Sequence, residues 1–450
     1  MNRLWIRRPE AVLARGDAGG GVVVADGVIS ELVPTGAIPT GWGRPGDTSV
    51  NASGDVILPG LINTHHHFFQ TLTRAWRPVV SAELFDWLTG LYDVWARLTP
   101  RTLETAVEVA LVELLLSGCT TAADHHYLYS AGLEEAVDIE VAVARRLGVR
   151  AVLTRGSMTL GRDAGGLPPQ STVQAAEATL EDSRRVVEAY HERGPGAMIQ
   201  VALAPCSPFS VTPEHMRRTA EMAEDLDVRL HTHLAETRDE EEFLRQAFGM
   251  RTVDYLESVG WLGPRTWVAH GVHFDDAEIA RLGAAGVGVA HCPTSNMRLA
   301  SGICRAVELE DAGAPVGLGV DGSASNDGSS LAAEIRAALY LQRLRYGAAA
   351  VTPERAYGWA TRGSARCLGR DDIGAIEVGR QADLALFDLD DIRYAGAHDP
   401  LAALVLCGVE RAHHVMVAGR WRVRDGEVIG VDLPALIAHQ REAAAQLLGR

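Results

Sequence analysis

The sequence of 450 residues contains no lysine, and all 42 of its basic side chains are arginine. A chain without lysine cannot form a Schiff base through a lysine amine, and it cannot build a Walker-type phosphate loop. It also cannot hold two metal ions together with a bridging group derived from lysine. Three widespread catalytic arrangements are therefore excluded before any motif is considered.

Other absences narrow the class of protein further. The six cysteines are scattered and none forms a Cys-x-x-Cys pair, so we expect neither a zinc finger nor a redox dithiol. Cysteines spread in this way favour a reducing cytoplasm. No stretch approaches about 18 uninterrupted apolar residues. The N-terminal segment lacks the apolar core of a signal peptide, so neither a membrane span nor a secretion signal is expected.

The charge balance argues against a nucleic-acid partner. The formal net charge is −16, and hydrophobic residues make up 47% and charged residues 22% of the chain. This is the composition of a globular protein. The arginines form no basic stripe of the kind that follows a phosphate backbone. We therefore expect neither nucleic acid nor a membrane as a partner.

Both ends of the chain are rich in short apolar runs broken by turns. Asp-Gly pairs at 26–27 and 425–426 each predict a tight hairpin between two strands. We favour one composite β-sandwich domain built from residues 1–58 and 376–430, with a C-terminal helix over 431–450. Two unrelated terminal caps are the alternative.

The middle of the chain, residues 59–375, alternates apolar runs with helical sequence. Eight strands that are each followed by helical sequence are what a (β/α)8 TIM barrel requires, and the length is suitable. A doubly wound open sheet follows from the same pattern and is the alternative. The apolar runs are Val56–Leu61, Thr120–Ala123, Arg150–Thr154, Gln200–Ala204, Arg229–Leu234, Thr266–His270, Gly286–Ala290 and Pro315–Val320.

Histidines stand at the ends of several of these runs. In the segment PGLINTHHH, His65 and His67 are two positions apart, so on an extended chain they point to the same side. Two imidazoles on one side can bind one divalent metal ion. A second run ends in HTHLAE, where His233 is a candidate third ligand and Glu236 a candidate for moving protons.

Two further groups end later runs. His270 stands in VAHGVH, and Asp321 follows an apolar run in GVDGSASN. A bare carboxylate is costly to bury, and either a metal ion or an ion pair with arginine would offset that cost. In a barrel, the four groups lie at the carboxyl ends of strands 1, 5, 6 and 8, the face that carries active sites.

Five motifs spread along the chain resemble those of the amidohydrolase superfamily, in particular its nucleobase-type deaminases and s-triazine hydrolases. They are, in order, PGLINTHHH, HTHLAE, VAHGVH, HCPTSN and GVDGSASND. Residues 373–383 are similar to the segment that returns these enzymes to their terminal β-sandwich, so the resemblance covers essentially the whole chain. It implies an α/β fold with a barrel, a metal-dependent aminohydrolase and a homo-oligomer.

The resemblance also implies a role for each candidate residue. One divalent metal ion, zinc by default with iron as the alternative, is held by four side chains: His65, His67, His233 and Asp321. Relatives with two ions bridge them with a carboxylated lysine, so a chain without lysine is expected to hold one. In the implied mechanism, Asp321 takes a proton from a water that the metal acidifies. His270 polarises the tetrahedral centre, Glu236 protonates a ring nitrogen, and Asp321 returns a proton to the departing amine.

Two positions bear on the substrate. Guanine deaminases and many triazine hydrolases carry a glutamine at the position of Gln70, which implies contact with a flat nitrogen heterocycle. A loop glutamine bonded to the backbone is the alternative. Guanine deaminases present an arginine-phenylalanine pair where this chain has Cys206 and Ser207. The small Cys206 leaves room for an extra ring oxygen, although a packed apolar cysteine is an equal alternative.

Four stretches are most similar to 8-oxoguanine deaminases: 65–76, 82–100, 117–127 and 203–210. That similarity implies hydrolysis of 8-oxoguanine, a purine-like small molecule, to urate and ammonia as a step of purine metabolism. Guanine, isoxanthopterin and s-triazines are the alternative substrates.

Several side chains near these motifs are expected to be structural. Trp87, Tyr92 and Trp95 are predicted to pack in the core instead of stacking on a substrate ring. His125 and His126 are predicted to be hydrogen-bonded structural histidines.

Overall fold

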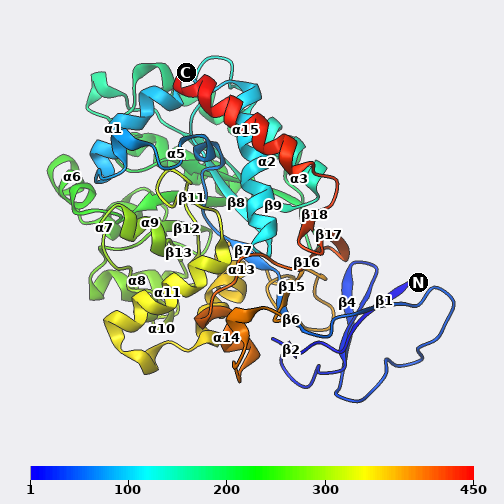
Figure 1. The fold of residues 1–450 in the computed structure, drawn as a ribbon. Helices are drawn as coiled ribbons and strands as arrows, with labels where there is room; N and C mark the ends of the chain where they lie inside the picture. The colour runs from blue at the N-terminus through cyan, green and yellow to red at the C-terminus, as the bar shows by residue number, and fades with distance from the viewer. Residues whose placement is uncertain (1, 450) are drawn as a thin grey trace.

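Eight parallel strands form a closed barrel at the centre of the chain, of which the structure describes residues 2–449 (Figure 1). In this computed structural model, each strand pairs with the next along the chain, and the ring closes where Leu318 pairs with Asn63. Helices cover the outside and side chains fill the interior, so the strands are almost entirely buried. The barrel strands are β7 (Leu61–Asn63), β8 (Cys119–His126), β9 (Arg150–Ser157), β10 (Ile199–Pro205), β11 (Arg229–Leu234), β12 (Thr266–His270), β13 (Gly288–His291) and β14 (Val316–Leu318).

The helices around the barrel begin and end at residues suited to those positions. Helix α8 (Asp276–Ala285) begins after Asp275, which exchanges hydrogen bonds with Glu278, and it ends where Gly286 adopts the left-handed conformation. The other helices are α1 (Leu84–Trp95), α2 (Pro100–Leu116), α3 (Ala136–Leu147), α4 (Ala176–Tyr190), α5 (Pro213–Asp225), α6 (Arg238–Phe248), α7 (Thr252–Ser258), α9 (Pro293–Arg298), α10 (Ala306–Asp311), α11 (Leu331–Tyr346), α12 (Pro353–Gly358), α13 (Ser364–Cys367), α14 (Pro400–Leu406) and α15 (Leu433–Leu448).

Two sheets formed by the chain ends lie beside the barrel (Figure 1). They share a separate apolar cluster that includes Ile6, Val22, Ile57, Leu384 and Met416. Residues from both ends therefore form one core, and the predicted fold class, a barrel with a small β-domain from both termini, is confirmed. The first sheet has the order β4 (Val28–Val33), β3 (Gly21–Ala25), β1 (Arg3–Arg7), β5 (Thr48–Asn51). The second has the order β18 (Glu427–Val428), β17 (Arg420–Arg424), β16 (His414–Val417), β15 (Leu384–Asp388), β6 (Asp55–Pro59), β2 (Ala11–Val12).

The alternatives of an open sheet and of two separate terminal caps are wrong, and so are the bounds predicted for the first barrel strand. The apolar run 56–61 is divided between two sheets, because β6 pairs with β15 and the barrel begins only at Leu61. Gly60 lies between them, where a Cβ atom would stand 2.2 Å from the side chain of Thr120. Both strands are fully buried, so a continuous apolar run carries no sign of the change of sheet.

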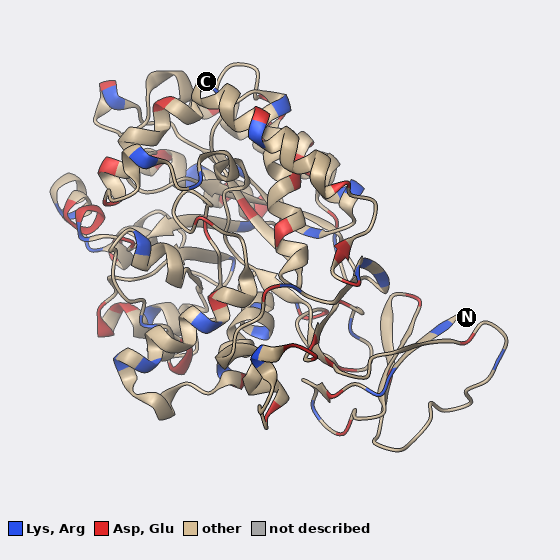
Figure 2. Cartoon of the chain, in the orientation of Figure 1, with Lys and Arg blue, Asp and Glu red and all other residues tan. Residues whose placement is uncertain are grey.

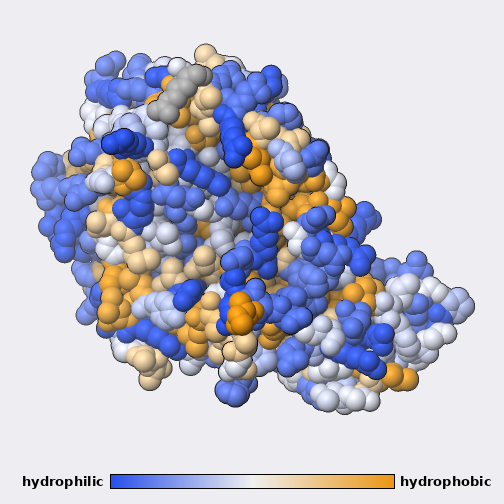
Figure 3. Space-filling view, viewed as in Figure 1, coloured by the Kyte–Doolittle hydropathy of each residue, from blue (hydrophilic) through white to orange (hydrophobic). Residues whose placement is uncertain are grey.

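The outer surface differs in character from the barrel interior. Acidic and basic side chains are interspersed over the outer helices (Figure 2). The face in Figure 3 is largely hydrophilic, with separate apolar areas. Over residues 2–449, no helix is long and apolar enough to cross a bilayer. The side chains of His65, His67, His233 and His270 are instead buried at the carboxyl end of the barrel.

A buried ion pair joins the barrel to the second terminal sheet. Arg150, at the start of β9, donates from Nε to Oδ2 of Asp383 at 2.9 Å and from Nη2 to Oδ1 at 3.1 Å. The two side chains are 0% and 2% exposed. Asp383 Oδ1 also accepts from the backbone N–H of Ala418, next to β16, at 2.7 Å. The pair therefore couples three segments that are far apart in the sequence.

We predict that Asp383→Asn strongly destabilises the protein. The substitution keeps the shape of the side chain but leaves the Arg150 guanidinium buried without a counter-charge. The free energy of unfolding should fall by about 3–5 kcal/mol, measured by chemical denaturation. The control is Glu442→Gln, because Glu442 forms an exposed pair with Arg101 and should cost less than about 1 kcal/mol. Equal losses in the two variants would contradict this account.

Candidate metal centre and active site

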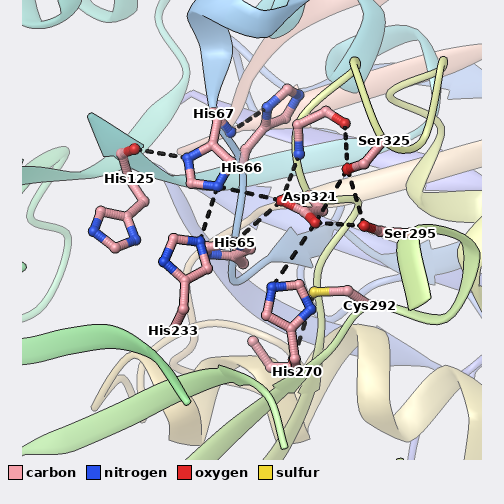
Figure 4. A network of polar contacts seen from close by, with 12 residues as sticks. His65, His66, His67, His125, His233, His270, Cys292, Ser295, Asp321 and Ser325 are labelled. Carbon is pink, nitrogen blue, oxygen red and sulfur yellow. Dashed lines mark hydrogen bonds and ion pairs between the residues drawn. The ribbon is translucent and has the colours of Figure 1, made fainter. Parts of the chain in front are cut away.

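Five side chains from four barrel strands converge at the carboxyl end of the barrel (Figure 4). His65 and His67 follow β7, His233 lies on β11, His270 ends β12 and Asp321 follows β14. Parallel strands in a barrel all end on the same side, so residues at their carboxyl ends meet although they are far apart in the sequence.

The four predicted metal ligands lie in contact. Nε2 of His65 and Nε2 of His67 are each 3.3 Å from Oδ1 of Asp321. Nε2 of His67 is 3.1 Å from Nε2 of His233. All four residues are at most 9% exposed. The structure thus brings these four side chains into one buried cluster.

Burial keeps the imidazoles of this cluster neutral. It lowers the pKa of His65 and of His67 to about 3, and that of His233 well below its ordinary value. Burial alone would raise the pKa of Asp321, but contact with His65 holds it well below the usual range. The cluster therefore presents three uncharged nitrogens and one carboxylate.

Hydrogen bonds to the backbone fix which nitrogen of each ring faces the centre. Nδ1 of His67 donates to the carbonyl oxygen of His125 at 2.8 Å. Nδ1 of His233 donates to the carbonyl oxygen of Cys206 at 2.6 Å. A neutral imidazole carries one proton, so in both rings Nε2 is left with a lone pair that points to the centre.

His65 is oriented by a second histidine. Nδ1 of His231 donates to the carbonyl oxygen of Trp267 at 2.9 Å, so Nε2 of His231 is an acceptor. Nδ1 of His65 donates to that acceptor at 2.8 Å, and Nε2 of His65 is again the free nitrogen. His231 is not among the functional residues predicted from the sequence. The signal was present, because His231 and His233 are two positions apart on one strand and share a face.

The donor set fits a divalent metal ion. Nε2 of His65 is buried and has no hydrogen-bond partner within residues 2–449, and its lone pair faces Oδ1 of Asp321. Two electron-rich atoms at this distance repel each other, and a cation between them would turn the repulsion into attraction. Three imidazole nitrogens and one carboxylate oxygen are ligands that zinc accepts.

Glu236 and His270 lie next to this cluster. Nε2 of His270 is 3.5 Å from Oε2 of Glu236 and 3.9 Å from Oδ2 of Asp321, while its Nδ1 donates to Oδ1 of Asn296 at 2.9 Å. Burial raises the pKa of Glu236 to about 7. Burial would lower the pKa of His270, but Glu236 and Asp321 raise it above its ordinary value. This arrangement can exchange protons near neutral pH.

The carboxylate of Asp321 is held from several sides. Its Oδ2 accepts hydrogen bonds from Ser295 Oγ at 2.6 Å and from Ser325 Oγ at 3.2 Å. Asp321, His270 and Ala235 all have positive φ angles, of 62°, 75° and 53°. Such backbone conformations are unfavourable for residues other than glycine and collect at functional sites. The strained backbone at Asp321 and His270 therefore accompanies the orientation of their side chains toward the cluster.

A cavity opens beside this cluster, at the end of the barrel where small ligands bind in this fold. The four residues predicted to contact the substrate all line it: Gln70, Cys206, Glu236 and His270. The lining is apolar on one side and polar around the cluster, and consists of His67, Gln70, Leu84, Trp87, Leu88, Tyr92, Tyr127, Cys206, Ser207, Phe209, His233, Glu236, His270, Leu299, Asp321 and Ser325.

Gln70 is held in one orientation. Its Oε1 accepts from the backbone N–H of Ala324 at 3.3 Å, which leaves Nε2 as the donor. Gln70 therefore makes the backbone contact that was the alternative prediction, and it also lines the cavity. The thiol of Cys206 remains protonated, because burial raises its pKa to about 12.

Trp87 and Tyr92 pack in the core, as predicted. Both are at most 4% exposed, yet both line the cavity, because one face of α1 lies over the barrel mouth. Trp95 points to the core as expected and donates from Nε1 to Thr73. Tyr127 was not predicted to line the cavity. It directly follows His125 and His126, and nothing else in the sequence distinguishes it.

His126 belongs to a second buried polar cluster, beside the first. Its Nε2 donates to the carbonyl oxygen of Leu128 at 2.8 Å, and its Nδ1 lies 3.1 Å from Oε1 of Glu140. Asp124 completes the cluster and accepts from the backbone N–H of Phe68 at 2.6 Å. Burial raises the pKa of Glu140 to about 8, so Glu140 is protonated at neutral pH. The cluster supports the backbone directly after His67.

The comparisons with known proteins agree with this geometry. The sequence model of the Amidohydrolase family matches residues 56–422, and the chain belongs to this family. It is 65% identical to the 8-oxoguanine deaminase of Pseudomonas aeruginosa over 100% of both chains. It is 38% identical to an isoxanthopterin deaminase from an unknown prokaryotic organism, over 90% of this chain and 88% of the relative.

Solved structures give the same result for the fold. The atrazine chlorohydrolase of Arthrobacter aurescens TC1, whose crystal structure was determined in complex with zinc, aligns with a TM-score of 0.91 and 31% identity. The alignment covers 98% of this chain and 100% of the neighbour. The barrel and the terminal sheets are therefore shared over the whole length.

We predict that Glu140 makes the wild-type protein less stable as the pH rises. Glu140 keeps its proton in the folded state up to about pH 8, whereas in the unfolded chain it loses the proton above about pH 4.5. Between these values the unfolded state releases a proton that the folded state retains, so stability falls with pH by up to about 1.4 kcal/mol per unit.

Glu140→Gln removes the contribution of Glu140, while Asp124, whose pKa burial also raises, keeps its own. Thermal unfolding between pH 5 and pH 8 should therefore show the variant gaining stability relative to the wild type as the pH rises. Glu181→Gln, at an exposed position, is the control and should follow the wild type at each pH. Parallel profiles for Glu140→Gln and the wild type would show that the carboxyl is not protonated in the fold.

Proposed function

We propose that this chain is a zinc-dependent aminohydrolase that converts 8-oxoguanine and water to urate and ammonia. The observation that carries the proposal is the 65% identity over the full length of both chains with the 8-oxoguanine deaminase of Pseudomonas aeruginosa. The buried cluster and its cavity supply groups suited to this reaction. The amino group on C2 of the purine is replaced by a hydroxyl group from water and leaves as ammonia.

The proposed metal ligands are the four side chains of the central cluster: His65, His67, His233 and Asp321. Zinc is favoured because the lone pairs of three neutral imidazoles and one carboxylate meet there. The zinc in the crystal structure of the Arthrobacter aurescens neighbour supports the same choice. When bound, such an ion lowers the pKa of a water molecule toward neutrality.

The protein side chains then move the protons. We propose that Asp321, with Oδ2 held by two serine hydroxyls, accepts a proton from the attacking water and later passes it to the departing amine. His270, whose raised pKa favours the protonated form, donates a hydrogen bond to the oxygen that adds to C2. Glu236, with a pKa of about 7, gives a proton to the ring nitrogen next to C2 and so makes that carbon electrophilic.

Substrate recognition is proposed for the cavity walls. The amide of Gln70 is fixed and has a donor left for a ring edge, and the small side chain of Cys206 leaves room beside the cluster. The apolar side formed by residues such as Trp87 and Phe209 suits a flat heterocycle. We also propose the division into a barrel domain over 59–375 and a composite β-domain over 1–58 and 376–430.

We predict that Glu236→Gln lowers kcat for 8-oxoguanine by about 100-fold or more, because the amide cannot deliver the proton. The measurement is ammonia release by zinc-loaded protein, with guanine and isoxanthopterin in parallel. The wild type should prefer 8-oxoguanine. Glu241→Gln, on α6 in a pair with Arg251 and outside the cavity lining, is the control and should retain wild-type activity.

Two results would contradict the proposal. Wild-type turnover restricted to other substrates would refute the assignment of 8-oxoguanine. Near-complete activity of Glu236→Gln, at unchanged zinc content, would refute the role of Glu236 as the proton donor.

A further inference from the structure

The hydroxyl group of Tyr92 has no role in the mechanism derived above, although it belongs to the same cavity. Tyr92 lies on α1, which covers the barrel mouth and contributes Leu84, Trp87, Leu88 and Tyr92 to the lining. These positions share one face of the helix. The inference that follows rests on the proposed function, because it concerns how the same cavity binds its purine.

Tyr92 is the exception among the polar aromatic side chains of α1. Trp87 donates from Nε1 to the carbonyl oxygen of Ala324 at 3.2 Å, and Trp95 donates from Nε1 to Thr73 Oγ1 at 3.1 Å. The Tyr92 hydroxyl has no hydrogen-bond partner anywhere in residues 2–449, and the residue is 0% exposed. A buried hydroxyl without a partner is costly and rare, and calls for a ligand or a water as its partner.

Tyr92 shares the cavity lining with Cys206 and Glu236. Burial raises the pKa of Tyr92 well above the usual range. The hydroxyl therefore keeps its proton and is a hydrogen-bond donor. Tyr92 is a cavity tyrosine whose buried hydroxyl has no partner within the described chain.

The chemistry of the substrate decides which edge meets Tyr92. In 8-oxoguanine, C2 lies between N1 and N3. N1 already carries a hydrogen, so the nitrogen that can receive a proton from Glu236 is N3. From N3, the ring edge continues through C4 and N9 to C8 and its oxygen. With N3 at Glu236, this edge extends into the cavity, whose lining also includes Cys206 and Tyr92.

We propose that the Tyr92 hydroxyl donates a hydrogen bond to the oxygen on C8 and thereby selects 8-oxopurines over purines that lack this oxygen. Cys206 permits the selection, because its small side chain leaves space for the oxygen next to the hydroxyl. A purine without the oxygen leaves the Tyr92 hydroxyl buried and unpaired, which penalises the wrong ligand.

The test uses binding instead of turnover, so that it does not depend on the deaminase activity. Zinc-loaded protein is titrated with urate, which has the oxygen on C8, and with xanthine, which lacks it, while tryptophan fluorescence is followed. The wild type should bind urate at least tenfold more tightly than xanthine. Tyr92→Phe should weaken urate binding about tenfold and leave xanthine binding unchanged, so that the ratio approaches one.

The control is Tyr255→Phe. Tyr255 on α7 is also buried, at 1% exposure, and its hydroxyl is also without a partner in the described residues, but it is outside the cavity lining. This variant should bind both purines like the wild type. Zinc content and melting temperature of each variant show whether the fold and the metal site are intact.

Three outcomes would overturn the inference. They are a wild type that binds urate and xanthine equally, a Tyr92→Phe variant that binds both like the wild type, and one that loses affinity for both to the same extent. The last outcome would indicate a merely structural role. Absence of ammonia release from 8-oxoguanine by the wild type, with the binding ratio as predicted, would instead refute the proposed function alone.

Discussion

The active end of the barrel depends on one electrostatic constraint, the burial of three imidazole lone pairs against a carboxylate. His65, His67 and His233 are kept neutral by burial, and their Nδ1 atoms are all used by other acceptors. The nitrogens that remain face Asp321 and one another at 3.1–3.3 Å. Without a cation this arrangement is repulsive, and with one it is a complete ligand set. The architecture around it serves to hold these atoms together.

Several independent features support that arrangement. Parallel barrel strands bring residues from distant parts of the chain to one end, and strained backbone at His270 and Asp321 sets the direction of their side chains. Hydrogen bonds from Ser295 and Ser325 to Asp321, and from His65 to His231, hold the ligand side chains in place. At the amino end of β9, away from the site, the ion pair of Arg150 and Asp383 connects the barrel to the terminal sheets. The site is therefore supported by contacts that reach beyond its own loops.

The sequence predicted the ligand cluster because simple rules govern it. Two-residue spacing puts His65 and His67 on one side, and a repeated strand-helix pattern implies a barrel whose strands end together. The same rules could have identified His231. They could not assign Tyr92 to the cavity, because its burial among Trp87 and Trp95 looks like core packing. That assignment depends on how α1 lies across the barrel mouth, which is set by tertiary packing.

A similar reason explains why the bounds of the first barrel strand were predicted wrongly and why the second polar cluster was not predicted. The run 56–61 changes sheet at Gly60 with no change in hydrophobicity, since both strands are buried. The cluster of Asp124, His126 and Glu140 joins two elements whose contact has no local periodicity. Local patterns identify which residues are polar and buried, but the partner that each one meets is decided by the closure of the barrel.

The most direct test of the central claim is the metal content of the protein, measured by elemental analysis after exhaustive dialysis and compared with Asp321→Asn. The account predicts one divalent ion per chain in the wild type and a large loss of bound metal in the variant, because the carboxylate supplies the only negative charge among the four ligands. A wild-type protein that binds no divalent ion, or a variant that binds it equally well, would contradict the account.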